Sequence, residues 1–295
     1  MLMVRAVDNR LLGVCEFGAP YGKPIFYLHG TPGSRLGPRP RTLLLHQLGV
    51  RLIMFDRPGY GESTRQPGRT VADGAADIAT VANELRLDQF AVVGRSGGGP
   101  HALACAALLP GRTTRVAALV TLAPSEADGL DWFAGMTRAN VTEFSTARHG
   151  REAVAERLRM AADRIRADPQ RMIAALYADL TDADRRVVAD IGIRQMLVSN
   201  FAEAFRQSAD GWIDDVMALT APWGFDPAII RTPTRVWHGA DDRFIPPGHS
   251  AWLGSRIPAA TVVLEPGGSH FGALSIMPSV LPWLAAALVG SAPPG

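Results

Sequence analysis

A serine flanked by glycines, directly after an apolar run, is the feature that most limits how this chain can fold. Gly94-Arg95-Ser96-Gly97-Gly98 follows the apolar residues 90–93 and precedes a helical pattern over residues 100–109. A strand that turns sharply into a helix through such a sequence forms a nucleophile elbow. Glycines at this turn let strand and helix pass closely, and the serine is held in a strained conformation. The sequence therefore predicts an α/β protein in which the Ser96 hydroxyl projects from the end of a strand.

Strand-like runs alternate with helical patterns along the first 124 residues. The apolar runs are residues 24–28, 52–55, 90–93 and 116–122, and the helical patterns are residues 71–87 and 101–109. Such alternation indicates βαβ crossovers and a mostly parallel sheet with helices on both faces. The earlier run at residues 11–17 is expected to form an antiparallel hairpin arm at the sheet edge.

The pattern becomes helical from about residue 128 to residue 219. Val154, Leu158, Ala161 and Ile165 recur at helical spacing, and Thr181-Asp182-Ala183-Asp184 resembles a capping box. We therefore expect an α/β core formed by residues 1–124 and 226–295. Residues 125–225 are expected to form a helical lid inserted between two strands.

Large apolar side chains are frequent in the predicted lid. Most are expected to pack lid helices together, while about a quarter face a substrate. They are Trp132, Phe133, Met136, Phe144, Met196, Phe201, Phe205 and Trp212.

Ser96 needs a base and an orienting acid, because an unassisted serine hydroxyl is a weak nucleophile. His270 is the predicted general base, since it lies in a glycine-flanked loop after the strand-like run 261–264. Asp242 is the predicted orienting acid, in the loop that follows the strand-like run 234–238. Loops at the carboxyl ends of parallel strands are where such sheets display catalytic groups.

Other acids satisfy part of the same reasoning. Asp241 is adjacent to Asp242, and Glu126 and Asp128 follow the strand-like run 116–122. These three stay open as alternatives to Asp242.

An oxyanion site is expected beside the elbow. The strand-like run 24–28 ends in His29-Gly30-Thr31-Pro32-Gly33. A loop there would place the backbone amide of Thr31 opposite that of Gly97, giving two donors for a developing oxyanion. His29 is expected to support this loop structurally.

These pieces together resemble the α/β-hydrolases, in the group of capped serine esterases and related carbon–carbon bond hydrolases. The matching segments are residues 29–32, 56–63, 94–98, 239–246 and 267–272, and the order Ser96, Asp242, His270 is the one this family uses. Arg95 and Gly97 occupy variable positions, where many relatives carry other residues, so they bear on substrate rather than on chemistry.

The resemblance implies a serine hydrolase that needs no cofactor. Such an enzyme would cleave a carboxylic ester of a small to medium apolar acyl compound through an acyl-enzyme. A carbon–carbon bond hydrolase acting on a ketone, or an enzyme of acyl transfer or cyclisation, could use the same triad. A non-catalytic receptor on this fold is a further alternative. Epoxide hydrolases and haloalkane dehalogenases are disfavoured, because their nucleophile is an aspartate.

Composition excludes some partners and locations. The net charge of +2 over 295 residues is too small to indicate binding to nucleic acid or a membrane surface. No apolar run is long enough for a membrane helix, and charged residues interrupt the N-terminal stretch, so a cytoplasmic protein is expected. Cys15 and Cys105 are expected to be two buried free thiols. Arg35, Arg39 and Arg41 are expected on a solvated or salt-bridged surface.

Overall fold

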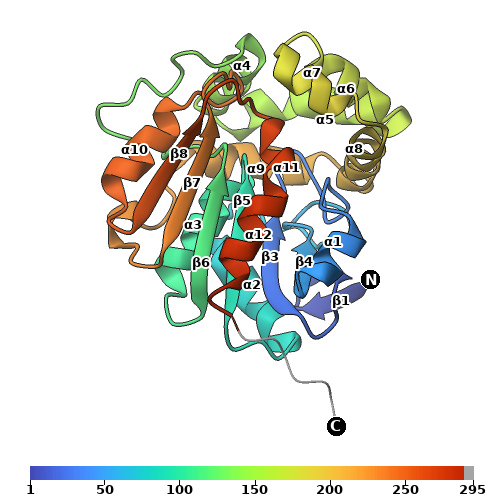
Figure 1. The fold of residues 1–295 in the computed structure, drawn as a ribbon. Helices are drawn as coiled ribbons and strands as arrows, with labels where there is room; N and C mark the ends of the chain where they lie inside the picture. Colours follow the sequence, from blue (N-terminus) through green and yellow to red (C-terminus); the bar gives the residue numbers. More distant parts are fainter. Residues whose placement is uncertain (289–295) are drawn as a thin grey trace.

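A computed structural model describes residues 1–288, and an eight-stranded sheet forms their centre (Figure 1). The sheet order is β1-β2-β4-β3-β5-β6-β7-β8, and the six strands β3 to β8 are parallel to one another. The strands are β1 (Leu2–Arg5), β2 (Leu11–Gly18), β3 (Lys23–Leu28), β4 (Val50–Phe55), β5 (Phe90–Arg95), β6 (Thr113–Leu119), β7 (Thr234–Gly239) and β8 (Ala260–Glu265). This arrangement confirms the predicted mostly parallel α/β sheet.

The antiparallel end of the sheet differs from the prediction in one respect. β2 is antiparallel as expected, but it pairs with β1 on one side and with β4 on the other, so it lies one strand in from the edge. The outermost strand, β1, was not predicted. It has four residues, of which Val4 alone is buried, and so short a run carries no readable alternation.

Helices cover both faces of the sheet, as predicted (Figure 1). One face packs against α1 (Thr42–Gln47), α11 (Gly272–Ser275) and α12 (Met277–Ala285), and the other against α2 (Asp73–Glu84), α3 (Gly98–Leu108) and α10 (Gly248–Arg256). Because successive side chains of a strand point to opposite faces, β3 serves both layers. Phe26 and Leu28 belong to the core cluster on the α3 face, and Ile25 and Tyr27 belong to the one on the α12 face.

Six helices separate β6 from β7 and lie above the carboxyl ends of the strands (Figure 1). They are α4 (Arg138–Ala147), α5 (Arg151–Ala167), α6 (Gln170–Leu176), α7 (Asp182–Val188), α8 (Ile191–Ala204) and α9 (Asp210–Thr220), and a 3₁₀ turn at Pro227–Ile229 leads into β7. The capping box predicted at Thr181 is present at the start of α7. The first helix begins at Arg138 rather than near residue 128, because Gly129 and Gly135 adopt positive φ in the intervening turns.

Residues 289–295 of the predicted core segment lie outside the described residues. Within residues 1–288, no helix is both long and apolar enough to span a bilayer.

Candidate active site

The turn after β5 has the strained geometry expected of an elbow. Ser96 has a φ of +55°, a region that residues with a side chain rarely occupy. Its amide donates to the Leu119 carbonyl of β6 at 2.9 Å. A Cβ on Gly94 would collide with the Gly98 carbonyl, and a Cβ on Gly98 would collide with the carbonyls of Leu28 and His29. The glycines are therefore required by the close approach of β5, α3 and β3.

His270 and Asp242 meet at the carboxyl end of the sheet. The Nδ1 atom of His270 donates to Oδ2 of Asp242 at 2.8 Å, although the two residues are separated by 28 positions. The other carboxylate oxygen, Oδ1, accepts the amides of Phe244 at 2.8 Å and Ile245 at 3.0 Å. These bonds orient the carboxylate toward the imidazole and leave Nε2 of His270 free of that contact.

The environment of Asp242 keeps it ionised. Burial alone would raise its pKa, but the His270 ring, together with His238, whose Nε2 lies 3.3 Å from Oδ2, lowers the pKa below its usual range. His238 is itself fixed by Ser250 at 2.5 Å and by the Ile245 carbonyl at 2.6 Å. An ionised carboxylate in this position accepts the Nδ1 proton of His270 in a hydrogen bond and fixes the orientation of the ring.

The alternative acids do not reach His270. Asp241, Glu126 and Asp128 are exposed, and among the described residues the only carboxylate within ion-pair distance of His270 is that of Asp242. The structure therefore brings together the predicted base and the predicted acid.

Ser96 and His270 line the same cavity. Their side chains are not hydrogen-bonded to each other within residues 1–288. In unliganded enzymes, catalytic hydrogen bonds are often long and tighten when substrate binds.

Thr31 and Gly97 also lie together. A Cβ on Gly97 would collide with the Thr31 side chain, so only glycine permits this contact. Neither backbone amide donates to an acceptor within the described part of the chain. Both amides are thus without an acceptor within residues 1–288, as an oxyanion site requires.

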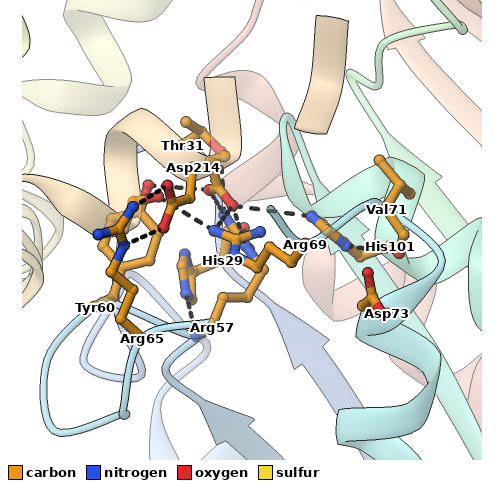
Figure 2. Close-up of polar contacts among 12 residues, drawn as sticks. His29, Thr31, Arg57, Tyr60, Arg65, Arg69, Val71, Asp73, His101 and Asp214 are labelled. Atoms are coloured by element: carbon orange, nitrogen blue, oxygen red, sulfur yellow. Dashed lines mark hydrogen bonds and ion pairs between the residues drawn. The ribbon is translucent and has the colours of Figure 1, made fainter. Parts of the chain in front are cut away.

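A buried ionic network holds the Thr31 loop from below (Figure 2). Asp215 of α9 accepts the Thr31 hydroxyl at 2.6 Å, the Tyr60 hydroxyl at 3.0 Å and Nη2 of Arg69 at 2.6 Å, and it forms a two-point ion pair with Arg57. The Arg57 guanidinium also donates to the Gly30 carbonyl at 3.0 Å. The loop and α9 are therefore joined through one carboxylate.

The two guanidiniums of this network keep the Asp215 carboxylate ionised. Burial alone would raise the pKa of Asp215, but Arg57 and Arg69 hold it well below its usual range. His29 supports the same loop, because its Nε2 accepts the Arg57 amide at 3.3 Å. Sequence reasoning missed Asp215, which lies 158 positions from Arg57 inside an ordinary helical pattern.

The arginines after the oxyanion loop differ from expectation. Arg35 is salt-bridged as predicted, but it is buried and not on the surface, between Asp56 and Glu203 of α8. Its carboxylate partners neutralise its charge and compensate for its desolvation. Arg39 lies over the Phe17 ring at 3.7 Å, and Arg41 is exposed.

A cavity of about 640 Å³ separates the elbow from the inserted helices. This volume suits a small molecule. Leu158, Ala161 and Ile165, which recur at helical spacing in α5, line its far wall. Of the eight large apolar side chains considered in the sequence, Phe201 and Trp212 line the cavity. Trp132, Phe133, Met136, Phe144 and Phe205 do not line it and pack in the hydrophobic core.

Metal-binding and thiol chemistry have no visible centre in the described residues. No group of three or more His, Cys, Asp or Glu side chains there could hold a metal ion. Cys15 and Cys105 are free thiols, as expected. Cys105 is buried, which raises its pKa, whereas Cys15 is only half-buried, contrary to expectation.

Comparison with known proteins places the chain in a family. The family model described as the alpha/beta hydrolase fold matches residues 23–275. The chain therefore belongs to the α/β-hydrolase family and is a hydrolase of that fold, as the sequence motifs indicated.

Individual relatives carry different activities. A non-heme haloperoxidase of Rhodococcus erythropolis is 28% identical over 92% of this chain and 93% of its own length. A proline iminopeptidase of Xylella fastidiosa is 35% identical, but the match spans only 37% of this chain and 36% of the relative. A thermophilic esterase of Thermogutta terrifontis has a similar fold, with a TM-score of 0.65, 22% identity and coverage of 98% and 99% of the two chains.

Proposed function

We propose that this protein is a serine hydrolase that cleaves carboxylic esters, with Ser96 as nucleophile, His270 as general base and Asp242 as orienting acid. The observation that carries the proposal is the His270–Asp242 hydrogen bond of 2.8 Å on a cavity that Ser96 also lines. That bond fixes the tautomer in which Nε2 of His270 can accept a proton.

The reaction would proceed through an acyl-enzyme. His270 removes the Ser96 proton as the oxygen attacks the ester carbonyl, and the Thr31 and Gly97 amides donate to the resulting oxyanion. Collapse of the tetrahedral intermediate releases the alcohol, which takes its proton from His270. Water activated by His270 then hydrolyses the acyl-enzyme, so no cofactor is required.

The inserted helices would act as the lid of this site, within the proposed segment 125–225. Lid residues including Leu158 and Phe201 give the cavity an apolar wall, which supports a small to medium acyl group as substrate. Carbon–carbon cleavage and acyl transfer use the same triad, and product analysis distinguishes them from ester hydrolysis.

A fluorophosphonate probe tests the nucleophile directly. We expect intact-mass analysis to show one adduct on the native protein and none on Ser96→Ala or on His270→Ala. Asp241→Asn is the matched control, because Asp241 neighbours Asp242 but does not contact His270. An adduct on Ser96→Ala would reject Ser96 as the nucleophile. A native protein that does not react would also reject the proposal and would favour the receptor alternative.

A further inference from the structure

Arg95 places a guanidinium within the cavity wall beside the nucleophile. It is the last residue of β5, directly before Ser96, and only 9% of its surface is exposed. Both Ser96 Cβ and Arg95 Nη1 lie within 3.5 Å of the point that a Cβ on Gly30 would occupy. The guanidinium therefore lies close to the bond that Ser96 is proposed to attack.

The Arg95 guanidinium has no hydrogen-bond or ion-pair partner within residues 1–288. Its Nε atom is buried without an acceptor, and the residue lines the cavity. The guanidinium carbon lies over the Phe271 ring, 4.9 Å from the ring centroid. Burying a guanidinium without an acceptor is energetically unfavourable. Its position next to the proposed nucleophile therefore points to an anionic ligand that would supply the acceptor.

The two acids whose charges act on Arg95, Asp242 and Asp184, accept hydrogen bonds from other groups. Asp242 binds His270 and two backbone amides. Asp184 accepts the Thr181 hydroxyl at 2.9 Å and the Phe271 amide at 2.7 Å. Burial therefore lowers the pKa of Arg95, and these carboxylates offset that effect only in part.

A second polar group lies beside Arg95. Tyr27 of β3 lines the same cavity, and its hydroxyl forms no hydrogen bond within the described residues. A guanidinium and a hydroxyl facing one space can together bind the two oxygens of a carboxylate.

We propose that Arg95, assisted by Tyr27, binds a carboxylate of the substrate, so that the enzyme prefers esters that carry a free carboxylate a few bonds from the scissile carbonyl. A single guanidinium balances a single negative charge, and its planar donors match a carboxylate. Apolar residues such as Met54 and Phe271 surround the pair, and this shell favours a monoanion over a more strongly hydrated phosphate. This inference rests on the proposed function, because Ser96 defines the reacting centre.

Matched esters test the charge preference. Monomethyl glutarate carries a carboxylate at the end of its acyl chain, whereas methyl pentanoate has the same number of acyl carbons and no charge. We expect kcat/KM of the native enzyme to favour the anionic ester by roughly 10-fold or more, as one charge-assisted interaction provides. In Arg95→Met this ratio should fall by roughly 10- to 100-fold, with partial recovery in Arg95→Lys.

A binding measurement keeps the inference separate from catalysis. Calorimetric titration of monomethyl glutarate into Ser96→Ala should show binding that weakens by roughly 10- to 100-fold in Ser96→Ala/Arg95→Met. Arg159→Met is the matched control, since Arg159 is on α5 but exposed and outside the cavity wall.

The outcomes separate the two proposals. If the fluorophosphonate labels Ser96 but the Arg95→Met ratio equals the native one, the carboxylate site is refuted while the hydrolase stands. A preference that instead vanishes in a variant of Arg157, Arg164 or Arg171, the other arginines lining the cavity, also refutes it. If Arg95-dependent binding is measured without labelling, the anion site stands and the proposed hydrolase is wrong.

Discussion

Asp215→Asn should destabilise the protein far more than the loss of a single hydrogen bond would. The native carboxylate is fully buried and is shared by Arg57, Arg69, Tyr60 and Thr31. The amide keeps the shape of the side chain but removes the charge and replaces one acceptor oxygen with a donor. The Arg57 and Arg69 guanidiniums, both also buried, then have no counterion within hydrogen-bonding distance among residues 1–288.

The magnitude follows from the cost of an unpaired buried charge. Removing one partner of a buried ion pair typically costs about 3–5 kcal/mol. Unfolding entropy scales with chain length, and 295 residues correspond to about 0.6 kcal/mol/K. The melting temperature should therefore fall by about 5–8 °C in Asp215→Asn.

Urea unfolding followed by tryptophan fluorescence measures this loss, and the rate of fluorophosphonate labelling reports on the Thr31 loop. Asp163→Asn is the matched control, because Asp163 pairs with Arg166 at 3.1 Å on an exposed face of α5 and should lose less than about 1 kcal/mol. A loss below about 1 kcal/mol in Asp215→Asn, with an unchanged labelling rate, would refute the reasoning that this carboxylate holds the loop.

Two other perturbations have outcomes fixed by local geometry. Burial lowers the pKa of His249 to about 4, and its neutral ring accepts the Ala123 amide at 3.1 Å. The unfolded chain takes up this proton at a higher pH, so the free energy of unfolding is complete above about pH 6.5 and falls by about 3 kcal/mol toward pH 4. Urea titrations at each pH should show this loss in the native protein and not in His249→Gln. Gly98→Ala should lower the free energy of unfolding by about 3 kcal/mol, because the new Cβ would collide with two backbone carbonyls. Gly111→Ala is the control and should be nearly neutral, because its Cβ would meet open space, and equal urea midpoints for the two variants would contradict this prediction.

Local patterns predicted the elbow and most of the sheet. Glycines around Ser96 are needed for close backbone contacts, and such contacts leave a mark in the sequence itself. The strand-like run 24–28 is recognisable because its side chains are buried on both faces of the sheet, and it forms β3 with one residue added, Lys23. Chain order, supplied by the family resemblance, linked His270 to Asp242, and the structure brings those two side chains together.

Contacts between residues far apart in the chain have no local sequence pattern that predicts them. Asp215 lies in α9 among residues that pack normally, and its partners are Thr31, Arg57 and Tyr60, more than 150 positions away. Arg35 follows the same rule, since a sequence shows an arginine but not the Glu203 that buries it. An ion pair that forms only when the chain folds cannot be inferred from local composition.

Helix α9 contributes to both the cavity wall and the support of the Thr31 loop. Trp212, near its start, forms part of the cavity wall, and Asp215, one turn later, binds Thr31. A rigid helix moves both side chains together, so a displacement that enlarges the cavity also shifts the loop that carries the proposed oxyanion donor. The Trp212 indole further donates to Glu143 of α4 at 3.0 Å, which extends the connection to a second inserted helix. Substrate shape and oxyanion geometry are therefore constrained by the same element, and mutations on α9 should alter kcat as well as KM.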